Sequence, residues 1–91
     1  MKIRTMVIVK GLVQRVNFRR FTQQNAIRLQ VTGWVQNLPD GSVEGCFEGE
    51  EAKVLALVDW CRTGPSASRV DAVVTERDTY TGEFDDFAIR R

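Results

Sequence analysis

The hydrophobic pattern of this sequence changes between strand-like and helix-like runs in a fixed order. Strand-like runs are rich in β-branched residues or apolar at alternate positions, whereas helix-like runs are apolar at every third or fourth position. The runs are, in order, a strand (Ile3–Val9), a helix (Phe18–Gln30), two strands (Val31–Asn37 and Ser42–Glu48), a helix (from Glu50 to the Gly64-Pro65 pair) and two strands (Arg69–Arg77 and Phe84–Arg90). The order βαββαβ with an additional strand predicts an α+β, ferredoxin-like sandwich, with two helices on one face of a mostly antiparallel sheet of four to five strands.

Apolar side chains predict which face of each element is buried. In the first helix they form an approximate stripe of Phe18, Phe21, Ala26 and Leu29. In the second helix the corresponding stripe is Val54, Leu57, Val58 and Cys61. In the strand 69–77 we expect one apolar face of Val70, Ala72 and Val74. In the strand 42–48 we expect a core face of Val43, Gly45 and Phe47 and a wetter face of Glu44, Cys46 and Glu48.

Turn-forming residues separate these runs. Pro39-Asp40-Gly41 lies between two strands, and it predicts a hairpin because proline presets φ and glycine accepts a positive φ. Gly64-Pro65 is a typical helix end. Residues 78–82 are polar and predict a connection before the last strand.

The length of 91 residues, with 43% hydrophobic and 27% charged residues, predicts one domain spanning residues 1–91. Thirteen basic and twelve acidic residues give a formal net charge of +1. General nucleic-acid and membrane-surface binders depend on large basic surfaces. We therefore expect neither a nucleic acid nor a membrane as a partner, and we expect a monomer.

The absence of histidine removes histidine acid–base catalysis and most transition-metal chemistry from consideration. Cys46 and Cys61 lie on different predicted elements without the spacing of a redox pair or a zinc site, so we expect core thiols, with a disulfide as the alternative. Residues 1–10 have neither the apolar core nor the cleavage site of a signal peptide, and no run reaches the roughly 18 apolar residues of a membrane span. These features predict a cytoplasmic protein.

The segment Lys10–Arg20 joins the first strand to the first helix. The first backbone N–H groups of a helix have no intrahelical acceptor, and together with the helix dipole they favour acidic side chains or a bound anion. The sequence instead places Arg15, Arg19 and Arg20 there. Because a phosphate accepts hydrogen bonds from N–H groups and guanidinium groups together, this combination predicts an anion site, with a solvated basic loop as the alternative.

The sequence resembles the acylphosphatase family. The matching segments cover nearly the whole chain in the right order: Gly11-Leu12-Val13-Gln14 with Val16 and Phe18-Arg19, Thr32 to Glu44, Gly64-Pro65 through Arg69-Val70, and Phe87-Ala88-Ile89-Arg90. The resemblance implies a small cytoplasmic enzyme that hydrolyses acyl phosphates, the mixed anhydrides of a carboxylic acid and phosphate, to carboxylate and inorganic phosphate. It implies no metal and no organic cofactor.

By position, the resemblance implies a role for each residue of the site. The phosphate-binding loop would comprise Gln14, Arg15, Val16, Asn17, Phe18 and Arg19. The Arg19 guanidinium would hold the phosphate with the loop N–H groups, and Asn37 would orient the attacking water. Inorganic phosphate would be both product and competing ligand.

This chemistry is reasonable without a protein base, because positioning and charge stabilisation dominate phosphoryl transfer. A guanidinium can bind two phosphate oxygens, and an asparagine amide can hold a water without deprotonating it. From local sequence alone, Arg19 could equally be a surface residue of the helix, and Asn37 could simply initiate the turn before Pro39.

Two loop positions depart from the family pattern. Arg15 stands where the family has glycine, and Asn17 stands at an often small position. A positive φ at Arg15 would cost about 1–2 kcal/mol, whereas asparagine tolerates it better. The alternative function is therefore a catalytically weak or inactive phosphate-binding or regulatory module. An RNA-binding module of the same topology would need aromatic residues on its central strands, and Ile3–Val9 has none.

Overall fold

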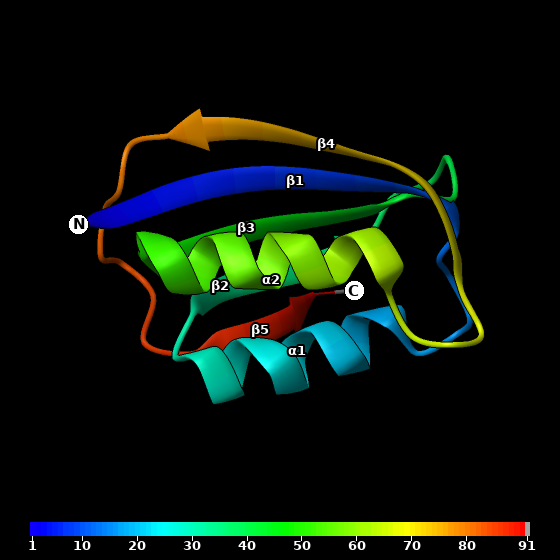
Figure 1. Cartoon of the computed structure of the whole chain (residues 1–91), viewed down its shortest axis with the longest axis horizontal. Helices are drawn as coiled ribbons and strands as arrows, with labels where there is room; N and C mark the ends of the chain where they lie inside the picture. The colour runs from blue at the N-terminus through cyan, green and yellow to red at the C-terminus, as the bar shows by residue number, and fades with distance from the viewer. Residues whose placement is uncertain (91) are drawn as a thin grey trace.

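A computed structural model describes residues 1–90, and Arg91, which the predicted domain includes, lies outside the described residues. Along the chain the elements are β1 (Lys2–Leu12), α1 (Phe18–Leu29), β2 (Thr32–Asn37), β3 (Val43–Glu50), α2 (Glu51–Thr63), β4 (Arg69–Asp78) and β5 (Phe87–Arg90). Both helices cover the same face of one sheet (Figure 1). Neither helix in residues 1–90 has the length and hydrophobicity needed to cross a membrane.

The sheet has five strands in the order β4-β1-β3-β2-β5. β1 pairs antiparallel with β3 and β4, and β2 pairs antiparallel with β3. Only β5 is parallel to its neighbour, β2. The predicted ferredoxin-like sandwich with two helices on a mostly antiparallel sheet is therefore confirmed.

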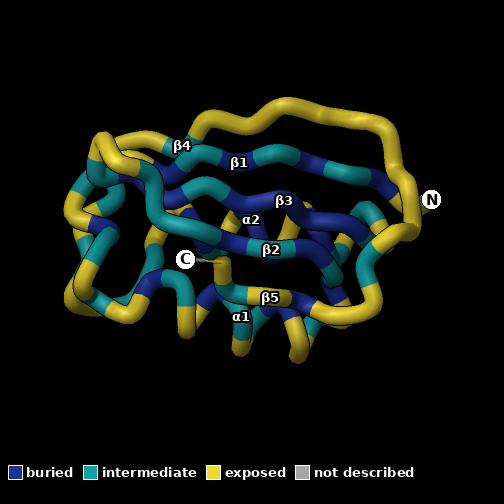
Figure 2. Tube along the Cα trace, turned by 180° about the vertical axis from the view of Figure 1, so that it is seen from behind, coloured by how far each residue is buried: buried dark blue, intermediate teal, exposed yellow. Residues whose placement is uncertain are grey.

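The core lies between the helices and the sheet, and seen from behind the sheet β4 is a largely exposed edge (Figure 2). β1 is central and turns alternate residues toward the helices. The stripe of α2 is buried as predicted. The apolar stripe predicted for α1 is partly wrong, because Phe21 is 40% exposed and Thr22 is buried instead. Phe18, Thr22 and Ala26 are four residues apart, which places them on one helix face, and the Thr22 hydroxyl donates to the Phe18 carbonyl (2.7 Å).

The predicted face of β4 is also wrong, because a β-bulge changes the alternation of its side chains. Lys10 pairs with Ala72 but Gly11 pairs with Val70, so Asp71 is the extra residue. Val70 and Val73 consequently pack against the core, whereas Val74 is 52% exposed. Gly11 permits this geometry, because a Cβ there would lie 2.1 Å from the Arg69 carbonyl oxygen.

Two element boundaries differ from the sequence prediction by three residues, and the other differences are smaller. β1 continues to Leu12, three residues into the predicted loop, because its pairing with β4 resumes beyond the bulge. The last strand begins at Phe87 rather than Phe84, since the preceding residues form a loop whose hydrogen bonds go to a buried carboxylate of β3.

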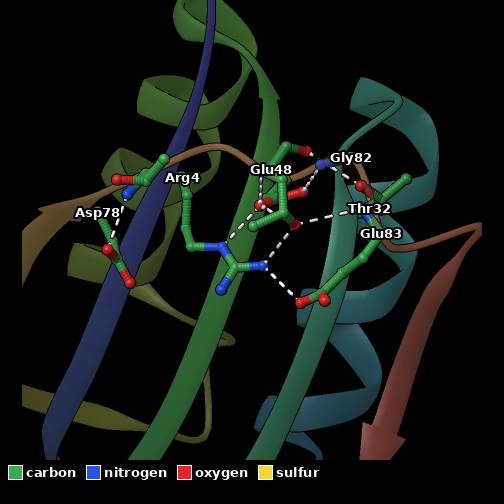
Figure 3. Close-up of polar contacts among 8 residues, drawn as sticks. Arg4, Thr32, Glu48, Asp78, Gly82 and Glu83 are labelled. Carbon is green, nitrogen blue, oxygen red and sulfur yellow. Dashed lines mark hydrogen bonds and ion pairs between the residues drawn. The ribbon is translucent and has the colours of Figure 1, made fainter.

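That carboxylate is Glu48, which is completely buried on the sheet face opposite the helices, so the predicted wetter face is wrong here. Its oxygens accept from Arg4 Nε (2.6 Å), from the amide and hydroxyl of Thr81 (3.0 and 3.1 Å) and from the Gly82 amide (3.1 Å). Arg4 also pairs with Glu83 at 2.7 Å (Figure 3). Burial alone would raise the pKa of Glu48, but these hydrogen bonds outweigh it and hold the pKa below the ordinary 4.5.

Candidate active site

The loop between β1 and α1 is bent by two residues in the left-handed region. Arg15 has φ 64° and Asn17 has φ 62°, and Val16 between them has no positive φ. Alternation of this kind turns successive N–H groups toward one side and forms a concavity that suits an anion. The loop is therefore strongly curved even though arginine occupies a position whose positive φ favours glycine.

Helix α1 begins directly after this loop, and its first hydrogen bond runs from the Phe21 amide to the Asn17 carbonyl (3.0 Å). Asn17 makes no side-chain capping bond, and the first turn contains no acidic residue. The amides of Phe18, Arg19 and Arg20 precede the helical hydrogen-bond ladder. This helix end consequently keeps its positive potential for a ligand.

Phe18 fixes the start of α1 against the end of α2. Its ring is 2% exposed and lies 5.4 Å from the Trp60 ring, a pairing worth about 0.5–1.5 kcal/mol beyond its burial. Gly64, at the C-terminus of α2 with φ 68°, approaches so closely that a Cβ would lie 2.8 Å from the Phe18 ring. The end of one helix thus supports the start of the other.

Gln14 connects the loop to the hairpin turn rather than facing the pocket. Its side-chain amide donates to the carbonyl oxygens of Leu38 and Ser42, each at 2.8 Å. Asp40 holds the same turn by accepting from the Ser42 hydroxyl (2.5 Å) and amide (2.9 Å), and these bonds keep the pKa of Asp40 below 3.8. Because Asn37 immediately precedes this turn, Gln14 fixes the distance between the loop and the end of β2.

Two side chains of α1 reach the neighbouring strand β5. Arg19 donates from one terminal nitrogen to the Arg90 carbonyl (2.9 Å), and Gln23, one turn later, donates to the Phe87 carbonyl (2.9 Å). A guanidinium has five N–H donors, so one backbone bond orients Arg19 and leaves donors for a ligand.

These elements enclose an open pocket of about 390 Å3. It is lined by Val13, Arg15, Asn17, Phe18, Arg19, Arg20, Gln23, Asn37 and Ile89. The Oδ1 atom of Asn37 is buried and has no hydrogen-bond partner within residues 1–90, a property it shares only with the Thr5 hydroxyl. A buried amide oxygen without a partner is unfavourable, and Asn37, which carries one, is among the residues that line the pocket.

The structure brings five of the seven predicted site residues to this pocket: Arg15, Asn17, Phe18, Arg19 and Asn37. Gln14 bonds to the turn, and Val16 packs against the core. Sequence reasoning omitted Gln23 and Ile89. The spacing of four between Arg19 and Gln23 could have indicated a shared helix face, whereas the position of Ile89 depends on the pairing of β5 with β2.

The fold and the pocket define a ferredoxin-like domain with a cationic loop at a helix N-terminus. The acylphosphatase family model matches residues 5–89. An acylphosphatase of Geotalea uraniireducens is 67% identical over 98% of both chains, and one of Geobacter sulfurreducens is 62% identical over 99% of both. The crystal structure of acylphosphatase from Bacillus subtilis superimposes with a TM-score of 0.94 at 31% identity, covering 98% of this chain and 99% of that one. The chain belongs to the acylphosphatase family.

The resemblance seen in the sequence is thereby confirmed, as is the expectation of an acylphosphatase enzyme. Full-length similarity to curated acylphosphatases supports the active enzyme and does not favour a weak or inactive module. The left-handed conformation of Arg15 agrees with this, because the loop retains its curvature there without glycine.

Proposed function

We propose that the pocket hydrolyses acyl phosphates with Arg19 and Asn37 as its catalytic residues. The observation that carries this proposal is the convergence of a cationic helix start and the unpartnered amide oxygen of Asn37 on one pocket. The loop N–H groups of residues 14–18 and the Arg19 guanidinium hold the phosphoryl group. Asn37, from the end of β2, holds the water.

Arg19 stabilises the phosphoryl group as the bond to the carboxyl oxygen lengthens. Its bond to the Arg90 carbonyl fixes the guanidinium before substrate arrives, so little reorganisation is needed. Two of the remaining N–H donors can bind two phosphoryl oxygens together. One such prepositioned donor contributes a factor of about 10²–10³ to kcat.

Asn37 positions the nucleophile without acting as a base. Its side-chain amide hydrogen-bonds to the water, whose oxygen attacks phosphorus as the bond between phosphorus and the carboxyl oxygen breaks. The carboxylate leaves with the electron pair of that bond, and a phosphoryl oxygen receives the proton of the water. This route needs positioning and charge stabilisation rather than a strong protein base.

Gln14 supports both groups without contacting the substrate through its side chain. Its two bonds to the turn after Asn37 hold the phosphate loop and the water-binding residue in register. We therefore assign Gln14 a positioning role, while its backbone belongs to the binding loop.

We further propose that residues 1–91 act as one domain, as a cytoplasmic monomer without a nucleic-acid partner. Cys46 and Cys61 are both free. Both are buried, and burial raises the pKa of Cys46 to about 11 and that of Cys61 to about 12, which keeps both thiols protonated near neutral pH.

Steady-state hydrolysis of benzoyl phosphate, with inorganic phosphate as inhibitor, tests the proposal. We expect turnover that phosphate inhibits competitively and that Arg19→Ala lowers by about 10²–10³. Arg62→Ala, at an exposed position in the last turn of α2, is the matched control and should retain the parent rate. An Arg19→Ala variant with the parent rate would contradict the assignment.

A further inference from the structure

The pocket contains more positive charge than a phosphoryl group requires. Three of its lining residues are arginines and none is acidic. Arg19 is half-buried and tied to β5, as the proposed phosphate ligand should be. Arg15 and Arg20 are exposed, and within residues 1–90 neither forms a salt bridge or a side-chain hydrogen bond.

Four other arginines within residues 1–90 have side-chain partners, whereas Arg62 on α2 has neither a salt bridge nor a side-chain hydrogen bond there. Arg4 and Arg77 pair with glutamates, Arg69 pairs with Asp71, and Arg28 bonds to Asn25. The first turn of α1, where an acidic residue would be favourable, contains none that could neutralise the neighbouring cations. Arg15 and Arg20 therefore retain their charge for a ligand in the pocket.

The charge balance indicates which ligand suits these two arginines. The phosphoryl group of an acyl phosphate carries close to two negative charges at neutral pH. The three guanidinium groups thus leave about one positive charge unmatched when the acyl group is neutral. A carboxylate on the acyl group would match it, whereas a second phosphate would bring an excess of negative charge.

The dimensions of the pocket allow such a substrate. Its volume of about 390 Å3 is many times the roughly 30 Å3 that one water occupies in the liquid, so it has room beyond the phosphoryl group. Val13 and Ile89 add apolar wall for methylene groups. The pocket thus combines space for an acyl chain with unpaired positive charge.

We propose that Arg15 and Arg20 recognise a carboxylate on the acyl group, so that the preferred substrates are monoacyl phosphates of dicarboxylic acids. This specificity rests on the proposed function, because it assumes that Arg19 and the loop bind the phosphoryl group. It assigns a purpose to the arginine that replaces the family's glycine at position 15.

The test compares succinyl phosphate with butyryl phosphate, which has the same number of carbons but a methyl group in place of the carboxylate. The readout is the ratio of the two kcat/KM values, since any effect on the shared phosphoryl group cancels. For the parent protein we expect a ratio of about 10 at low ionic strength, falling at high salt because the two arginines are exposed.

Arg15→Gln and Arg20→Gln should each lower this ratio about two- to fivefold. The matched control is Arg62→Gln, which removes the same charge from α2 outside the pocket and should leave the ratio unchanged. Equal ratios in the parent and in the Arg15→Gln and Arg20→Gln variants would overturn the specificity. So would a parent that hydrolyses butyryl phosphate as efficiently as succinyl phosphate, and in both cases the proposed function would stand. Hydrolysis of neither substrate would refute the proposed function and the specificity with it.

Discussion

Two clusters of polar and charged residues lie toward opposite ends of the sheet, and they differ in how their arginines are satisfied. Figure 3 shows the cluster around Glu48. At one end, Arg4 is held by Glu48 and Glu83, and loop amides complete the hydrogen bonding of Glu48. At the other end, Arg15 and Arg20 have no acidic partner within residues 1–90, and Asn37 has a buried oxygen without a donor.

This difference distinguishes residues that stabilise the fold from residues that are available to bind a ligand. A buried charge that is fully hydrogen-bonded stabilises one arrangement of the chain and has no capacity left for a ligand. Unpartnered cations and polar atoms in an open pocket lower stability or leave it unchanged, but they can bind. Substitutions in the Glu48 network should therefore change stability, and substitutions in the pocket should change activity.

The largest effect is expected from Glu48→Ala. This change leaves Arg4, whose side chain is 14% exposed, without its buried partner and frees two loop amides. We expect unfolding free energy to fall by about 3–5 kcal/mol, measured by urea denaturation. Glu44→Ala, on the same face but only half-buried, is the control with a smaller loss. A folded Glu48→Ala protein with reduced kcat would break the separation.

Asn37→Ala should have the converse effect. Removing its amide takes away the proposed water ligand, and we expect kcat for benzoyl phosphate to fall about 10²-fold, which is about 2.7 kcal/mol. Stability should hardly change, since the Oδ1 atom has no partner within residues 1–90. Asn25→Ala, on α1 outside the pocket, should retain kcat. Unchanged turnover in Asn37→Ala would remove this residue from the mechanism.

Gln14→Ala tests the comparison further, because we assign Gln14 both a stabilising role and a positioning role at the pocket. Its two hydrogen bonds stabilise the fold and also position the loop against the turn after Asn37. We expect a stability loss of about 1–3 kcal/mol together with a higher inhibition constant for inorganic phosphate. Thr22→Val removes the buried hydrogen bond from the Thr22 hydroxyl to the Phe18 carbonyl within α1. This variant should lower stability without changing the inhibition constant for inorganic phosphate. Loss of stability alone in Gln14→Ala would make this residue purely structural.

Acid should affect the Glu48 network with a predictable sign. The pKa of Glu48 is lower in the folded protein than the ordinary 4.5, so its contribution is complete above that pH and is lost as pH falls through the folded pKa. As pH falls from above 4.5 through the folded pKa of Glu48, the unfolding free energy should fall less steeply in Glu48→Gln than in the parent. Parallel curves would mean that the carboxylate is not stabilised by folding.

The smallest change is expected from Arg15→Gly. Glycine adopts the left-handed conformation without strain, so we expect unfolding free energy to rise by about 1 kcal/mol, measured by thermal denaturation. Arg20→Gly, inside α1 at negative φ, should instead be destabilising by about 1 kcal/mol. Lower stability in Arg15→Gly would show that the arginine side chain contributes contacts that outweigh the strain.

The sequence predicted the fold well because element order and local periodicity survive in the structure. It failed where distant segments decide burial. Glu48 looks like a solvent-facing residue of an alternating strand, and only the loop at residues 81–83 makes it buried. The bulge at Asp71 likewise depends on the close approach of β4 to Gly11, which periodicity within β4 cannot reveal.

For the candidate site, the family resemblance predicted that Arg19 and Asn37 act together, because it rests on two separate segments of the chain. From local sequence alone, Asn37 could simply initiate the turn. The burial of its side-chain oxygen and its place at the pocket depend on the folded structure, where the end of β2 lies next to the loop. The bonds from the Gln14 side-chain amide to the Leu38 and Ser42 carbonyls could not be predicted, because they depend on how closely the loop approaches the hairpin turn. The position of Ile89 at the pocket could not be predicted either, because it depends on the parallel pairing between β5 and β2.

The hydrogen bond between Arg19 and the Arg90 carbonyl joins residues 71 positions apart. Closing so long a stretch of chain is slow and entropically costly, whereas a helix such as α1 can form locally within about a microsecond. During refolding, helical signal should therefore return before the guanidinium reaches its working orientation. Enzymatic turnover in this protein is consequently a reporter of a long-range step of folding.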